Sequence, residues 1–383
     1  MAISPLFFFN YLIKNGINFF CGVPDSLLKN FCLCIDENVK KEQHIITANE
    51  GNAIALAAGY YLGTGKIPLV YMQNSGLGNA INPLLSLCDS DVYSIPMIVL
   101  LGWRGEPGVK DEPQHVKQGL IHEEILSVIG ASSSIISRKS TDIPEIINLG
   151  VKTALKKQSP FFLSVKKDTF EKYNNKVEIK NSNKMIRENA LEIILKKIPD
   201  DAIVVSTTGK TSREIFEIRK KNTESHKKDF LTVGSMGHCS SIALGIAISS
   251  PKRKIICIDG DGALIMHMGS LATIGQLYPI NFYHILINNY VHESVGGQRT
   301  SAKNINFCDL SKANGYNNIL SVNNKPDLVS KFDSFLRKSG PNFLEVKVNH
   351  DSRNDLGRPT IKPVDNKKDF MFYIKNSINN SKK

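Results

Sequence analysis

Short apolar runs alternate with helix-patterned stretches along almost the whole chain. In the first half a helix pattern near Pro5–Asn15 comes first, and the Ala-rich stretch Gly51–Leu62 also has a helical pattern. Strands that alternate with helices predict a parallel sheet covered on both faces. The apolar runs that we interpret as strands are INFFCGV, HIITANE (ending at Glu50), IPLVYMQ, IPMIVLLGW and FFLSVKK, the last near Phe161–Lys167.

The polar stretch EKYNNKVEIKNSNKMIREN separates this series from a second, similar one. Its Asn- and Lys-rich composition is typical of a linker. The strands expected after it lie in AIVVSTTGK, FLTVGSMGHCSSIALGIAIS, KIICIDGDG, INFYHILINN and PNFLEVKV. We therefore expect an α/β domain at 1–170, a linker at 171–189, a second α/β domain of five or six strands at 190–362 and a basic tail at 363–383, with a helix near its DFMFYIKN segment.

One stretch of the second series, Lys254–Asn289, carries candidate metal chemistry. An apolar run ends in Asp259-Gly260-Asp261-Gly262, a crossover helix follows, and a second apolar run ends in Asn288-Asn289. The carboxyl ends of neighbouring parallel strands meet at one edge of a sheet, so Asp261 and Asn289 could lie together there. Carboxylate and amide oxygens suit Mg²⁺, and the glycines would let the backbone approach a diphosphate. The alternative is an ordinary βαβ unit whose turn happens to read DGDG.

Composition narrows the class of protein. A chain of 383 residues favours two domains, and its apolar content of 42% is that of a globular protein. No apolar run has the length of a membrane span. The seven cysteines have neither disulfide-framework nor zinc-site spacing, so we expect a protein of the reducing cytoplasm. The net charge of +12 raises the alternative of nucleic-acid binding, but the basic residues are dispersed and form no recognised motif.

The DGDG turn followed by Asn288-Asn289 resembles the signature of thiamine-diphosphate enzymes. Other features in the same order support the resemblance: the early turn Gly22-Val23-Pro24, the stretch ANEGNAIALAAGY with Glu50, and VGSMG at Val233–Gly237. The resemblance implies two doubly wound parallel-sheet domains, a pyrimidine-binding one (1–170) and a diphosphate- and Mg²⁺-binding one (190–362). The chain has no room for the middle domain of larger family members, which makes a carboligase such as acetolactate synthase a poorer match.

Longer strings resemble one subgroup of that family, the phosphonopyruvate decarboxylases. They are GWRGEPGVKDEPQHVKQG, TTGKTSREIFE, TVGSMGHCSSIALGIA, VHESVGGQ and SRNDLGRPT. The resemblance covers about residues 17–360. One departure is Arg299, which stands in GGQRT where the family pattern has proline; a new guanidinium in that loop could alter anion preference or simply face solvent.

The resemblance assigns roles to particular residues. Thiamine diphosphate would be held through Mg²⁺ by Asp261, Asn289 and the main-chain carbonyl of Val291. Glu50 would bond the pyrimidine ring of the cofactor and activate it. The remaining cofactor contacts would come from Gly234, Ser235, the apolar wedge Met236, Gly260, Gly262 and Ala263. The candidate acids for proton transfer are Asp25, His115, His292 and Glu293.

The expected substrate, 3-phosphonopyruvate, carries a carboxylate and a phosphonate, so cationic side chains should converge on it. The candidates are Arg104, Lys110, Lys210, Arg213, Arg353 and Arg358. Sulfopyruvate decarboxylase, which acts on a sulfonate, is the nearest alternative. The resemblance also implies a homodimer or higher homo-oligomer in which the first domain of one subunit faces the second domain of another.

Overall fold

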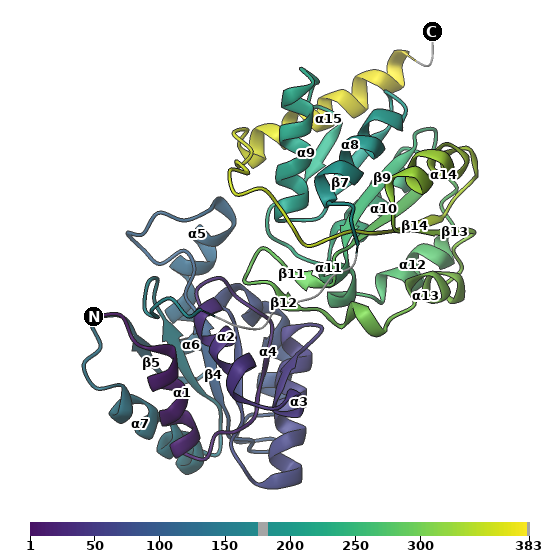
Figure 1. The fold of residues 1–383 in the computed structure, drawn as a ribbon. Helices are drawn as coiled ribbons and strands as arrows, with labels where there is room; N and C mark the ends of the chain where they lie inside the picture. Colours follow the sequence, from purple (N-terminus) through teal and green to yellow (C-terminus); the bar gives the residue numbers. More distant parts are fainter. Residues whose placement is uncertain (175–182, 381–383) are drawn as a thin grey trace. The chain divides into compact units, whose positions relative to one another are not determined.

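The computed structural model describes residues 1–174 and 183–380, with the side chains described as far as residue 375. The chain forms two compact units (Figure 1). Unit 1 comprises Met1–Ile179 and His292–Arg299, and unit 2 comprises Lys180–Val291 and Thr300–Lys383. Much of the predicted linker and the last residues of the predicted tail lie outside the described residues, and the sequence-based domain boundaries stay predictions.

Unit 1 is built on a six-stranded parallel sheet with the order β2-β1-β3-β4-β6-β5. The sheet is doubly wound, because the chain runs from β1 to β2 at one edge and then turns back to β3 and β4 on the other side of β1. Its strands are β1 (Phe20–Gly22), β2 (His44–Ile46), β3 (Leu69–Gln73), β4 (Ile98–Gly102), β5 (Ser132–Ile136) and β6 (Phe161–Val165).

Helices cover both faces of this sheet (Figure 1). Alternate strand residues point to opposite faces, so Tyr71 and Leu100 pack with α1, α2 and α7, whereas Val70 and Val99 pack with α3, α4 and α6. The helices are α1 (Pro5–Lys14), α2 (Lys29–Asn38), α3 (Glu50–Thr64), α4 (Leu77–Ser86), α5 (Pro113–Leu120), α6 (His122–Val128) and α7 (Ile143–Lys157), with short 3₁₀ turns η1 (Lys41–Gln43) and η2 (Asn74–Gly76).

Unit 2 repeats this architecture. Its parallel sheet has the order β13-β14-β10-β9-β7-β8, so β9 and β10 are neighbours at its centre. The strands of this sheet are β7 (Ile203–Ser206), β8 (Asp229–Leu231), β9 (Ile255–Gly260), β10 (Phe282–Asn288), β13 (Asn318–Val322) and β14 (Asn342–Lys347). The two-residue strands β11 (Val291–His292) and β12 (Gln298–Arg299) pair with each other, and all but Val291 belong to unit 1.

One face of the unit 2 sheet packs on α8, α9 and α14 through an apolar cluster that includes Ile256, Ile258 and Ile285. The helices of the unit are α8 (Arg187–Lys197), α9 (Lys210–Lys221), α10 (Cys239–Ser249), α11 (Asp261–Met266), α12 (Ser270–Leu277), α13 (Phe307–Ala313), α14 (Lys325–Arg337) and α15 (Pro363–Asn380), with the 3₁₀ turn η3 (Ser301–Asn304). None of the described helices is long and apolar enough to cross a membrane.

The α/β prediction with two parallel sheets is confirmed, and several details differ from the sequence-based expectation. The strand expected to run to Glu50 ends at Ile46, and Glu50 is the first residue of α3, because the Asn49 side chain accepts the Asn52 N–H and caps the helix. The crossover between β9 and β10 holds two helices, α11 and α12, instead of one. The predicted linker extends to 189, but α8 already begins at Arg187.

Candidate active site

In unit 2 the two predicted metal ligands lie together. Asp261 follows β9, Asn289 follows β10, and these strands are parallel neighbours in which Gly260 pairs with Ile287. The backbone N–H of Asn289 donates to the Asp261 carboxylate, and the Thr300 hydroxyl donates to Asp261 Oδ2 at 2.5 Å. The juxtaposition expected from the βαβ unit is therefore present.

The Asp261 carboxyl is almost completely buried. Burial raises its pKa to about 6, although hydrogen bonds from Thr300 and from the backbone N–H groups of Asp261, Asn289 and Gly262 oppose the shift. A buried carboxylate is stabilised by a nearby cation, and the oxygens gathered here are those that Mg²⁺ prefers. The residues present therefore fit the metal that the sequence predicts.

Asparagine side chains shape the turn after β10. Asn289 Oδ1 accepts the Val291 N–H at 3.2 Å, and Asn288 Oδ1 accepts the Tyr290 N–H at 3.2 Å. Tyr290 has a positive φ of 67°, which such a turn requires. Asn288 also donates to Glu345 Oε1 on β14 at 2.8 Å. The Asn-Asn pair thus divides its roles, because Asn288 anchors the turn to the sheet while Asn289 lies beside Asp261.

The Gly234–Gly237 stretch lies against α11. Gly234, Ser235 and Gly237 all have positive φ, and the Gly234 N–H donates to Thr208 Oγ1 at 3.1 Å. A β-carbon at Gly237 would lie 3.1 Å from the Ala263 carbonyl oxygen and 2.5 Å from His267 Cδ2, so this glycine allows the close approach. The predicted wedge Met236 is half-buried.

Cationic side chains join two further motifs of unit 2. These motifs are TTGKTSREIFE, which runs into α9, and SRNDLGRPT. Lys210 donates to Ser352 Oγ at 2.6 Å, and Arg213 donates to the carbonyl oxygens of Leu356 and Gly357. Arg353 forms ion pairs with Glu188, Glu217 and Asp355. These side chains therefore hold the 352–358 segment on α9, and a contact with substrate stays a prediction.

In unit 1 Glu50 is buried at the start of α3. The carboxyl accepts a hydrogen bond from Asn79 Nδ2 at 2.7 Å, and burial raises its pKa, an effect that the Asn79 bond opposes. A β-carbon at Gly76 would lie 2.7 Å from Glu50 Oε1, so glycine is needed beside the carboxyl. Asn79 was not among the predicted residues. It stands in the stretch NSGLGN (residues 74–79), and its contact with Glu50 joins residues 29 positions apart, which no local sequence pattern indicates.

A second polar cluster forms where β1, β3 and β4 end. Asp25 is fully buried; it accepts from Gln73 Nε2 at 2.7 Å and from the Leu27 N–H at 2.9 Å. Burial raises the pKa of Asp25, and these hydrogen bonds oppose the rise. Arg104 donates to Ser26 Oγ at 2.7 Å and forms an ion pair with Asp111. The structure thus groups the predicted Asp25 and Arg104 with Gln73 and Asp111, which the sequence analysis missed.

The remaining predicted residues are more scattered. His115 is buried in α5, and its pKa is lowered to about 4 by burial and by the charge of Arg104. Burial also lowers the pKa of His292 in β11 to about 4, and Glu293 follows it. Lys110 and Arg358 are exposed, as is Arg299.

Family models match both halves of the chain. Residues 7–126 match the thiamine pyrophosphate enzyme N-terminal TPP binding domain, and residues 207–346 match the C-terminal TPP binding domain. The Asp261 cluster lies within the second match and Glu50 within the first.

Three relatives align over most of the chain. A phosphonopyruvate decarboxylase of Streptomyces viridochromogenes is 31% identical over 94% of this chain and 92% of its own, and one of Streptomyces hygroscopicus is 30% identical over 91% and 88%. A sulfopyruvate decarboxylase of Methanosarcina acetivorans is 29% identical over 87% of this chain and 88% of its own. The chain belongs to the thiamine pyrophosphate enzymes, in the family of the phosphonopyruvate decarboxylases, and is a decarboxylase that uses this cofactor.

Proposed function

We propose that the enzyme decarboxylates 3-phosphonopyruvate to phosphonoacetaldehyde and CO₂ with thiamine diphosphate and Mg²⁺, in the cytoplasm, as a step of phosphonate biosynthesis. The observation that carries the substrate is the match to two phosphonopyruvate decarboxylases along nearly their full length. The candidate cations of both units provide donors for a phosphonate.

Asp261, Asn289 and the Val291 carbonyl would hold the Mg²⁺ ion that binds the diphosphate, with Gly260, Gly262 and Ala263 alongside. When bound, the cofactor supplies the electron sink that a 2-oxo acid needs to lose CO₂, which no side chain can supply. The carbon–carbon bond to the carboxylate breaks, and its electron pair is later protonated.

Glu50 would exchange a proton with the pyrimidine ring of the cofactor. Burial raises the pKa of its carboxyl, which favours the protonated form and so the sharing of a proton with a ring nitrogen. The Asn79 amide fixes the carboxyl by donating to Oε2. Asp25, His115, His292 and Glu293 are the proposed acids for the later proton transfers. A lowered pKa makes the two histidines neutral at pH 7, so each would first take up a proton and then pass it on.

The substrate test offers 3-phosphonopyruvate and sulfopyruvate separately to the Mg²⁺-loaded enzyme and follows aldehyde formation with a coupled reductase. We expect the higher kcat/KM for the phosphonate. A tenfold preference for the sulfonate would assign the chain to the alternative, sulfopyruvate decarboxylation, which the Methanosarcina relative supports.

The test of Glu50 is the Glu50→Gln variant. It should bind cofactor and lose turnover by about a hundredfold, because the amide cannot exchange a proton. Turnover close to that of the parent enzyme, with cofactor bound, would refute the role of Glu50.

A further inference from the structure

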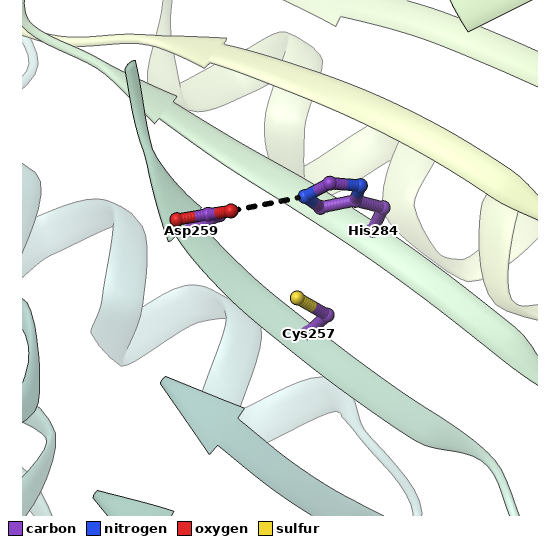
Figure 2. Close-up of side chains that lie close together, drawn as sticks. All are labelled: Cys257, Asp259 and His284. Atoms are coloured by element: carbon purple, nitrogen blue, oxygen red, sulfur yellow. Dashed lines mark ion pairs between the residues drawn. The ribbon is translucent and has the colours of Figure 1, made fainter. Parts of the chain in front are cut away.

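Three polar side chains are buried on one face of the unit 2 sheet, immediately before the DGDG turn. Cys257 and Asp259 lie two residues apart on β9, and His284 lies on β10 directly opposite Cys257. All three have no solvent exposure, and Figure 2 shows their side chains on the same side of the two strands. On the opposite face Ile256, Ile258 and Ile285 belong to the apolar cluster of the unit.

These side chains extend into a line that reaches the turn. The Tyr316 hydroxyl lies 3.0 Å from His284 Nδ1, and His284 Nε2 lies 3.5 Å from Asp259 Oδ2, an ion pair that Figure 2 marks. The other oxygen of Asp259, Oδ1, accepts the Gly260 N–H at 2.9 Å. Gly260 directly precedes Asp261, so the line runs from Tyr316 to the backbone of the residue before the proposed metal ligand.

Buried polar side chains lower the stability of a sheet core compared with apolar ones, so we look for a role that apolar residues could not fill. Burying a carboxylate is unfavourable without a partner. In the described chain neither Asp259 Oδ2 nor His284 Nε2 has a hydrogen bond; the two atoms face one another at 3.5 Å, with the Cys257 thiol beside them. A leucine or valine at either position would serve packing equally well. An acceptor aimed at the Gly260 N–H, however, fixes the backbone as it leaves the strand.

We propose that Tyr316, His284 and Asp259 are positioning residues that hold the Gly260–Asp261 turn in the orientation that binds the diphosphate and its cation. The proposal rests on the diphosphate role of Asp261 given above. His284 acts through Asp259: it orients the carboxylate, whose Oδ1 then restrains Gly260 and thereby the start of α11.

The trio of Cys257, Asp259 and His284 has a competing interpretation, because these are also metal-ligand types and their ligand atoms lie within 4.8 Å of one another. The positioning role is favoured because Asp259 already accepts the Gly260 N–H and faces His284, and because Cys257 Sγ lies 3.6 Å from the Cys239 thiol. A metal bound there would remove Asp259 from its role beside Gly260, so the experiment includes metal analysis.

The test measures the dissociation constant of thiamine diphosphate by calorimetry, with protein stripped by EDTA and then supplied with excess Mg²⁺. The variants are His284→Leu, His284→Gln, whose amide can again donate toward Asp259, and Tyr316→Phe. The matched control is Tyr283→Phe, which removes a buried hydroxyl next to His284 in β10 but on the opposite face of the sheet. There the Tyr283 hydroxyl donates to the carbonyl oxygens of Leu336 and Lys338. The thermal unfolding temperature of each cofactor-free variant is measured alongside.

We expect His284→Leu to raise the dissociation constant about tenfold, a size typical of the loss of an outer-shell partner, and His284→Gln to restore most of the affinity. Tyr316→Phe should weaken binding about threefold, and Tyr283→Phe should leave it unchanged even where it lowers the unfolding temperature equally. If His284→Leu does not fold, the dissociation constants of Tyr316→Phe and Tyr283→Phe are compared instead, and equal values would overturn the proposal.

Affinity that simply follows unfolding temperature across all variants, control included, would overturn the proposal. So would one equivalent of zinc that survives EDTA treatment of the parent and is lost in Cys257→Ser. Because the readout is cofactor binding, the result does not depend on which 2-oxo acid is the substrate.

Discussion

The glycine at position 76 leaves the space that the Glu50 carboxyl occupies. A β-carbon there would lie 2.6 Å from Glu50 Cγ and 2.7 Å from Oε1, whereas a β-carbon at Gly78, in the same motif, would meet nothing within 4 Å. We expect Gly76→Ala to displace the carboxyl from Asn79 and lower kcat about a hundredfold, with Gly78→Ala close to the parent. Steady-state kinetics with saturating cofactor, with circular dichroism to confirm folding, makes the comparison; equal activity of the two variants would contradict it.

The buried Asp261 carboxyl should make the metal-free protein less stable as pH rises. Its pKa in the folded chain is about 6, against 3.8 for an ordinary aspartate, so the folded state binds the extra proton between these values. The free energy of unfolding is therefore highest below pH 4 and falls as the pH rises through 6, by about 3 kcal/mol in total.

The Asp261→Asn variant should not show this fall in the free energy of unfolding with rising pH. In EDTA at pH 7.5 the variant should unfold at a higher temperature than the parent and should show a flatter stability profile between pH 4 and 7, while failing to bind cofactor with Mg²⁺. Asp201→Asn, at an exposed position, is the control and should follow the parent. Denaturant unfolding at several pH values measures the difference, and parallel profiles for parent and Asp261→Asn would show that the carboxyl is not destabilising.

At the scale of elements, strands with apolar sequences were predictable, including the edge strands β2 and β8. β9 and β10 lie in mostly apolar runs, and their parallel pairing followed from the helical pattern between them, which was enough to bring Asp261 to Asn289. β5 and β13 were missed because their sequences, SSSII and NILSV, are half-polar and only partly buried, so no apolar run marks them.

Contacts between elements far apart in sequence could not be predicted in the same way. The Asn79 bond to Glu50 and the Gln73 bond to Asp25 join residues 29 and 48 positions apart, and no local pattern marks either pair. The cations of SRNDLGRPT were predicted as substrate ligands, yet Arg353 is held by carboxylates of α8 and α9. Charge and motif identify such residues, but only the packing of helices decides their partners.

The attachment of the 352–358 segment to α9 gives a prediction at this scale. Glu217 accepts the Gly357 N–H at 2.7 Å and forms an ion pair with Arg353, so Glu217→Ala removes both contacts. We expect faster hydrogen exchange in the segment and, if it contacts the phosphonate, a KM raised about tenfold with cofactor affinity unchanged. The exposed Lys220→Ala on the same helix is the control. Unchanged exchange in Glu217→Ala would mean that other contacts hold the segment.

At the scale of the whole molecule, Glu50 belongs to one compact unit and Asp261 to the other. The family resemblance implies that a catalytic centre takes these two residues from different subunits of a homo-oligomer. Glu50→Gln and Asp261→Asn should then each be inactive alone, yet complement one another when mixed. In a mixed dimer one centre receives both mutations and the other receives none.

Random reassortment of equal amounts of the two variants should therefore recover about a quarter of the parent activity, since half of the dimers are mixed and each has one intact centre. The variants are unfolded and refolded together with cofactor and Mg²⁺, and light scattering gives the mass of the active species. Separate refolding followed by mixing without exchange is the control and should stay inactive. If co-refolded variants also stay inactive while forming mixed dimers, each centre draws Glu50 and Asp261 from the same chain, and an active monomer would lead to the same conclusion.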